Sequence, residues 1–133
     1  MSGFVLPRYV GGSARGWELA DYVEVEKSTA AAGADGVAVL ELPQLDGDER
    51  WLIDHAVTTC TSSTVTDLRY YLGTVGRDTS IIEQTDNGNF DVADWPNGLR
   101  VGPSGVLTLR WTGCSTGAVG SANLQIRVLR RGS

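Results

Sequence analysis

The residue types most able to hold a ligand lie in residues 85–98, TDNGNFDVADWPNG, where aspartate, asparagine and glycine surround one tryptophan. Carboxylate and amide oxygens are the ligands that Ca²⁺ takes in proteins. The stretch fails the EF-hand pattern, because starting at Asp86 the third position is Gly88 and the fifth is Phe90. Asp, Asn and Gly also predominate in ordinary turns, and we favour that interpretation. An irregular cation site, which stays open, would draw on Asp86, Asn89, Asp91 and Asp94.

The same stretch contains residue types that bind carbohydrate. An aromatic ring beside hydrogen-bonding side chains suits a sugar, and Trp95 stands close in sequence to Asp94 and Asn97. Trp17 is a second candidate aromatic residue for such a site. A tryptophan before a proline is at least as often a cap over the end of a sandwich core, and we favour that role for Trp95.

Catalytic residues are hard to assemble from this sequence. His55 is its one histidine, which excludes a metal site built from several histidines. Asp54 should point to the opposite face of a strand, so we do not expect it to join His55 in a Ser-His-Asp triad; a distant aspartate stays open. A histidine on one face with Trp51, Ile53 and Val57 is better explained as a structural residue. We predict no enzyme, and no catalytic, metal-binding or cofactor-binding residue.

Cys60 and Cys114 are the two cysteines, and their spacing fits no zinc motif. A disulfide between them requires adjacent strands and an oxidising compartment, and the apolar run GFVLP near the N-terminus is too short for the core of a signal peptide. Burial as two small apolar side chains is the simpler interpretation, and the disulfide is left open.

The net charge and the lack of long apolar runs argue against two kinds of partner. A net charge of −5 provides no basic field to hold a nucleic-acid backbone, so no nucleic acid is expected. No apolar run reaches the roughly 18 residues of a membrane-spanning helix, so no membrane is expected either.

The elements that must position these residues are strands. Short alternating or β-branched stretches follow one another at intervals of about ten residues, separated by turn sequences, and no helical period is convincing. Residues 85–98 are expected to form an exposed loop that crosses between two sheets. The predicted fold is all-β, a two-sheet antiparallel β-sandwich and most simply a jelly roll of about eight strands. The predicted strands are residues 22–26, 37–42, 49–60, 67–75, 79–84, 99–101, 106–111 and 122–130.

Residues 1–21 are interpreted as an N-terminal arm, and residues 22–133 as the β-sandwich domain. The arm shows no sustained period, yet it carries large apolar side chains that a free tail would usually lack. We therefore expect it to pack on its own domain or on a neighbouring subunit. The expected contact residues of the arm are Phe4, Val5, Leu6, Tyr9 and Trp17.

Residues 47–131 resemble the small virion proteins of tailed bacteriophages that infect actinobacteria. The resemblance rests on the stretches ERWLIDHAV, RYYLG, DVAD (residues 91–94), WTG (residues 111–113) and a closing strand that contains Gln125. It implies a jelly roll or related sandwich that acts by assembly, as a minor tail, tail-tip, head-to-tail or capsid decoration protein. It also implies location in the virion after synthesis in the host cytoplasm, and no catalytic residues. In this interpretation the DVAD loop crosses between the sheets and Trp111 anchors the core.

The predicted function is therefore that of a virion structural protein. Its partners would be copies of itself, in a trimer or higher ring, and other virion proteins. The alternative is a sandwich module that recognises a glycan on a bacterial surface. In both cases the expected contact residues of the loop are Asp91, Asp94, Trp95 and Asn97.

Overall fold

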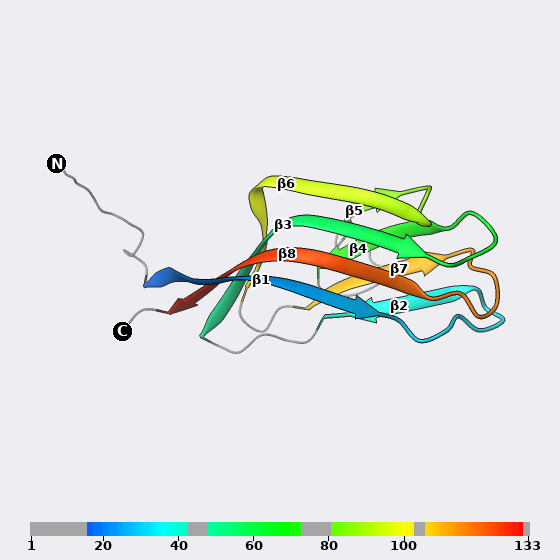
Figure 1. Cartoon of the computed structure of the whole chain (residues 1–133), viewed down its shortest axis with the longest axis horizontal. Helices are drawn as coiled ribbons and strands as arrows, with labels where there is room; N and C mark the ends of the chain where they lie inside the picture. The colour runs from blue at the N-terminus through cyan, green and yellow to red at the C-terminus, as the bar shows by residue number, and fades with distance from the viewer. Residues whose placement is uncertain (1–15, 43–47, 73–80, 103–105, 132–133) are drawn as a thin grey trace.

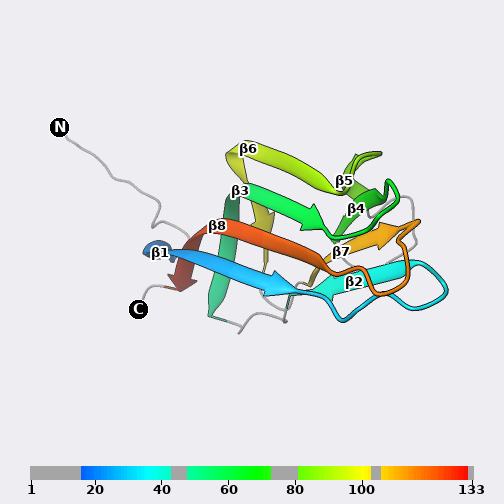
Figure 2. The same cartoon turned by 45° about the vertical axis from the view of Figure 1, so that its right-hand side comes forward.

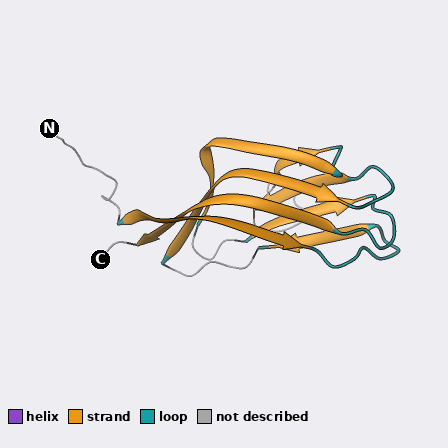
Figure 3. Cartoon of the chain, viewed as in Figure 1, coloured by secondary structure: helices purple, strands orange, loops and turns teal. Residues whose placement is uncertain are grey.

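The computed structural model describes residues 16–42, 48–72, 81–102 and 106–131, and these form strands and connecting loops (Figure 3). Two four-stranded sheets lie face to face (Figure 1). The strands are β1 (Trp17–Ser28), β2 (Val37–Glu41), β3 (Glu49–Cys60), β4 (Asp67–Leu72), β5 (Ile81–Thr85), β6 (Phe90–Val101), β7 (Leu107–Thr112) and β8 (Gly120–Arg131).

The strand order identifies the topology. The first sheet runs β1-β8-β3-β6 and the second runs β2-β7-β4-β5, with every neighbouring pair antiparallel. Except at β4 and β5, each strand lies in the other sheet from the strand before it, which is the connection pattern of a jelly roll. The all-β, two-sheet antiparallel sandwich predicted from the sequence is thereby confirmed.

The core lies between the two sheets and centres on Trp111. As the alternation predicts, β7 points Leu107, Leu109 and Trp111 inward, and β8 points Ala122, Leu124, Ile126 and Val128 inward. The Trp111 indole donates a hydrogen bond of 2.9 Å from Nε1 to the carbonyl of Gly88. A Cβ on Gly120 would stand 2.6 Å from Trp111 Cε3, so only glycine lets β8 pass this close to the ring.

The predicted boundary between arm and domain is wrong. β1 begins at Trp17 rather than at Tyr22, because this segment pairs with the end of β8, where Trp17 lies opposite Arg131 and Leu19 opposite Leu129. The register shifts between Leu19 and Asp21, and this break hides the strand pattern in the sequence. Residues 17–21 therefore belong to the sandwich. The other expected arm residues, Phe4, Val5, Leu6 and Tyr9, lie outside the described residues.

A bulge at Asp54 reverses the inward and outward faces of β3. Trp51 and Ile53 are buried before it, and Ala56, Thr58 and Cys60 are buried after it. The register passes from Ile53 opposite Ile126 to His55 opposite Gln125, which leaves one extra residue on β3. The prediction that His55 shares a face with Trp51 and Ile53 is therefore wrong.

The expected exposed loop is for the most part a strand. β6 pairs with β3 on both sides of an irregular segment, residues 95–98, that stands opposite Asp54 alone. Gly98 ends this segment with φ +81°, and a Cβ there would approach Leu52 Cβ and Arg127 Nη2 to 2.9 Å each. The crossing between sheets takes place earlier, at residues 86–89. Turn-forming residues suggested a loop, but pairing with β3 determines the structure.

Candidate functional site

A row of polar side chains crosses the outer face of the first sheet, meaning the face turned away from β2-β7-β4-β5. Val23 and Val25 pack on the core, so Tyr22 and Glu24 of β1 point outward. The register then places Glu24 beside Gln125, Gln125 beside His55, and His55 beside Asp94. Since neighbouring strands lie roughly 4.8 Å apart, adjacent members of this row are within reach of one ligand.

His55 and Asp94 form the far end of that row. His55 Nδ1 hydrogen-bonds Asp94 Oδ1 and so ties β3 to β6 just before the irregular segment. The distant aspartate that the sequence left open is thus Asp94. The pair joins edge strand β6 to its neighbour β3.

Asp54 and Arg127 form a second pair on the outer face. Because of the bulge, Asp54 points outward like its neighbour His55, contrary to the alternation assumed from the sequence. Arg127 donates hydrogen bonds of 2.8 Å from Nε and 2.7 Å from Nη2 to the two carboxylate oxygens of Asp54. These bonds raise the pKa of Arg127, so the guanidinium stays charged and fixes the carboxylate in one orientation.

A hollow of about 300 Å³ lies on the outer face of the first sheet, between Tyr22, Asp54 and Gln125. Its walls come from β1, β8 and β3 at the place where the first sheet bends, and the turn of β3, β6 and β8 is visible in Figures 1 and 2. Tyr22 forms an exposed wall of the hollow, with 69% of the residue accessible to solvent. The lining residues are Tyr22, Val23, Glu24, Asp54, Gln125 and Ile126.

An apolar corner, defined as Val57, Phe90 and Val92, occupies the other end of the outer face. Phe90 is 60% exposed and Val92 is 45% exposed, and Val57 lies directly opposite Val92. β6 is also an edge strand of the first sheet, so one side of its backbone faces no strand among the described residues. The corner and the hollow are separate features of the same face.

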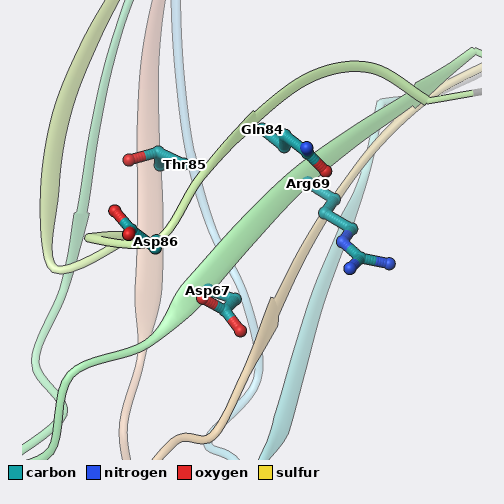
Figure 4. Close-up of a pocket in the computed structure, with 5 residues that line it drawn as sticks. All are labelled: Asp67, Arg69, Gln84, Thr85 and Asp86. Carbon is teal, nitrogen blue, oxygen red and sulfur yellow. The ribbon is translucent and has the colours of Figure 1, made fainter.

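A wider groove of about 490 Å³ runs over β4 and β5 (Figure 4). It is lined by Asp67, Arg69, Gln84, Thr85 and Asp86. Figure 4 shows Arg69 beside Gln84, pointing away from Asp67 and Asp86, so the charged groups do not converge on one ligand position. We therefore do not assign a site to this groove.

The four expected loop residues do not form one surface. Asp94 is bonded to His55 on the outer face, and Asn97 is exposed in the irregular segment. Trp95 packs against the core, its ring 5.7 Å from that of Tyr70 in an edge-to-face arrangement, as the cap interpretation predicted. Asp91 lies opposite buried Thr58, and partial burial raises the pKa of the Asp91 carboxyl group.

The asparagine at the sheet crossing, Asn89, hydrogen-bonds the segment that connects β3 to β4. Asn89 Oδ1 accepts hydrogen bonds from the Thr66 amide at 3.1 Å and the Thr66 hydroxyl at 2.6 Å. Asn89 Nδ2 donates to the carbonyls of Ser62 and Thr64. Within the described ranges, no three His, Cys, Asp or Glu side chains come together in a way that could hold a metal ion.

Trp17 and the cysteines are engaged inside the domain. Arg50 and Arg131 each place a guanidinium over the Trp17 ring, 4.5 Å and 4.8 Å from its centre, so this residue is not a free contact of an arm. Cys60 and Cys114 are buried free thiols. Burial, and then the neighbouring Cys60, raise the pKa of Cys114 to about 11. The Cys114 thiol is therefore protonated at neutral pH and lies close to Cys60.

The sequence analysis assigned no site role to Tyr22, Gln125 or Arg127. Tyr22 and Gln125 lie within predicted strands, and their alternation with buried or partly buried valine and isoleucine shows that they point outward. Their meeting depends on the pairing of β1 with β8, which joins opposite ends of the chain. Sequence spacing alone carries no signal of that pairing.

Comparison with protein-family models, with curated proteins and with solved structures finds no match for this chain. None of the described residues belongs to a helix long and apolar enough to cross a membrane.

Proposed function

We propose that this chain is a structural subunit of a tailed-bacteriophage virion and that it acts by assembling with copies of itself and with other virion proteins. The observation that carries the proposal is the apolar corner on edge strand β6. Two large apolar side chains, Phe90 and Val92, are exposed there beside Val57. Neighbouring exposed apolar side chains and an unpaired strand edge are both features through which one chain can contact another.

The fold supports this proposal. A jelly roll is a rigid block whose faces and edges can meet neighbours without rearrangement, and it is an architecture of viral capsid domains. The long strands β1, β3, β6 and β8 hold the apolar corner on a stiff sheet, so its geometry is fixed before any partner arrives. Synthesis in the host cytoplasm followed by incorporation into the virion is part of the same proposal.

The occupant we assign to the apolar corner is a second copy of this chain. Homo-oligomers of closed symmetry are the usual outcome when one surface patch repeats on identical subunits. Phe90 would be the central contact, since aromatic side chains at the middle of an interface contribute most to affinity. A trimer or higher ring is the expected assembly.

The test is to change the corner and measure self-association by sedimentation velocity over a range of concentrations. Phe90→Ser should raise the dissociation constant by about tenfold or more. Val65→Ser is the matched control, because Val65 is 72% exposed but lies outside the corner. Equal self-association of both variants and the unaltered chain would show that the corner is not the contact.

A further inference from the structure

We propose that the hollow on the outer face of the first sheet binds a neutral saccharide. This inference does not rest on the virion proposal, because it concerns other residues and a monomer suffices for it. It moves glycan recognition away from Trp95 and Trp17, which are engaged within the domain, to the wall formed by Tyr22.

The aromatic wall suits one face of a sugar ring. Tyr22 is 69% exposed, and it lies directly opposite Arg127 on β8. Its ring can cover the C–H face of a pyranose while its hydroxyl stays in contact with water. A flat aromatic surface also loses little conformational entropy on binding, because the side chain has two rotatable bonds.

The polar wall suits sugar hydroxyls, which both donate and accept hydrogen bonds. Gln125 offers an amide donor and an amide acceptor, and Glu24 beside it offers acceptors alone. Asp54 adds a carboxylate whose orientation is fixed by the two hydrogen bonds from Arg127. A polar group that is held in place before the ligand arrives loses less conformational entropy on binding than a mobile one.

The charge of the hollow selects among saccharides. Glu24 and Asp54 line it, and the guanidinium of Arg127 is already bound by Asp54. No cation lines the hollow to receive a carboxylate or sulfate, among the residues described. Neutral sugars are therefore accepted, and uronic acids or sulfated sugars are repelled.

The bend of the sheet produces the hollow. Asp54, at the bulge of β3, lines the hollow, and the register shift between Leu19 and Asp21 on β1 directly precedes Tyr22. Figure 2 shows that the first sheet turns along β3, β6 and β8. A regular flat sheet would present the same side chains as an even surface. A volume of about 300 Å³ is at the lower end of small-molecule sites, which fits one or two sugar units.

The experiment is a titration of the ¹⁵N-labelled full chain, monitored by two-dimensional NMR, with galactose, mannose, N-acetylglucosamine and their disaccharides. Glucuronic acid is the acidic comparison. At least one neutral sugar should shift the Gln125 side-chain amide and the backbone amides around Tyr22 and Glu24, with millimolar affinity. Glucuronic acid should leave them in place.

Two variants and a control separate binding from folding. Tyr22→Ala should weaken the affinity by about tenfold, whereas Tyr22→Phe, which keeps the ring, should retain most of it. Phe90→Ser, outside the hollow, should bind sugar like the unaltered chain. The proposal is overturned if no neutral sugar shifts these signals, if the shifts centre on other residues, or if Tyr22→Ala folds normally and binds equally well.

Discussion

Arg127 on β8 holds Asp54 on β3 by two hydrogen bonds at the one position where β3 carries an extra residue. The pair fixes the bulge on which the outer face of the first sheet depends. Without Arg127, the Asp54 carboxylate would lose both hydrogen bonds at the bulge. Without Asp54, the Arg127 guanidinium would lose its fixed orientation near Gly98.

Arg127→Gln should therefore lower the free energy of unfolding by about 1 kcal/mol, the scale of a partly exposed bidentate ion pair. Urea unfolding at neutral pH measures it. Arg130→Gln is the control, since Arg130 lies 3.6 Å from its nearest carboxylate, on Glu49, and is more exposed. An equal loss in both variants would contradict a special role for the pair at the bulge.

Gly120→Ala should be strongly destabilising, because the new Cβ would stand 2.6 Å from the buried ring of Trp111. We expect a loss of about 1–3 kcal/mol, as for other overpacked cores. Gly102→Ala is a suitable control, since a Cβ there meets no atom within 4 Å. Thermal unfolding measures the stability of the two variants. Equal midpoints for Gly120→Ala and Gly102→Ala would contradict this account of the Trp111 contact.

Alkaline pH should unfold the protein through two buried acids. Burial raises the pKa of Tyr70 from 10.0 to about 12. The pKa of Cys114 rises from 9.0 to about 11. The native state therefore holds these protons more tightly than the unfolded chain does. Stability should be full below pH 9 and decline from there through pH 11 to 12.

The measurement for this alkaline decline is urea unfolding in steps of pH, with Tyr70→Phe as the diagnostic variant. Tyr70→Phe removes one of the two titrating groups, so its stability should fall less steeply with pH above 10 than that of the unaltered chain. Parallel curves for the two proteins would contradict the assignment of the decline to Tyr70.

Asp91→Asn should stabilise the protein at neutral pH. Burial, with a contribution from Glu83, raises the pKa of Asp91, so its ionised form weakens the fold at any pH above its ordinary range. The gain should be about 0.5 kcal/mol, as for other partly exposed charges, and should vanish at low pH where both states are protonated. Asp86→Asn at the exposed crossing is the control and should change little.

The sequence predicts regular strands well and bulges poorly. The bounds of β3 were predicted correctly, because β-branched and aromatic residues recur along it. Its bulge was missed, since one extra residue at Asp54 leaves a sequence that still alternates plausibly. The sequence predicts a strand over residues 99–101 of β6 but a loop before them, because the turn-forming residues 95–98 interrupt the pattern. Pairing with β3 makes most of residues 90–98 part of the strand.

The candidate sites depend on contacts that single-sequence patterns do not contain. The role of Trp95 as a cap was predictable from its neighbour Pro96, and the structure confirms it. The hollow beside Tyr22 was not predictable, because it needs the register of β1 on β8 and the bend at Asp54 together.

The central claim is that this chain assembles with copies of itself. The molar mass of the purified chain in solution tests this claim most directly. Light scattering after size exclusion should be run on the full chain and on its Phe90→Ser variant. The account predicts a defined multiple of 14.2 kDa for the full chain, and a loss of that multiple in Phe90→Ser. A mass of 14.2 kDa for the full chain at every concentration would contradict it.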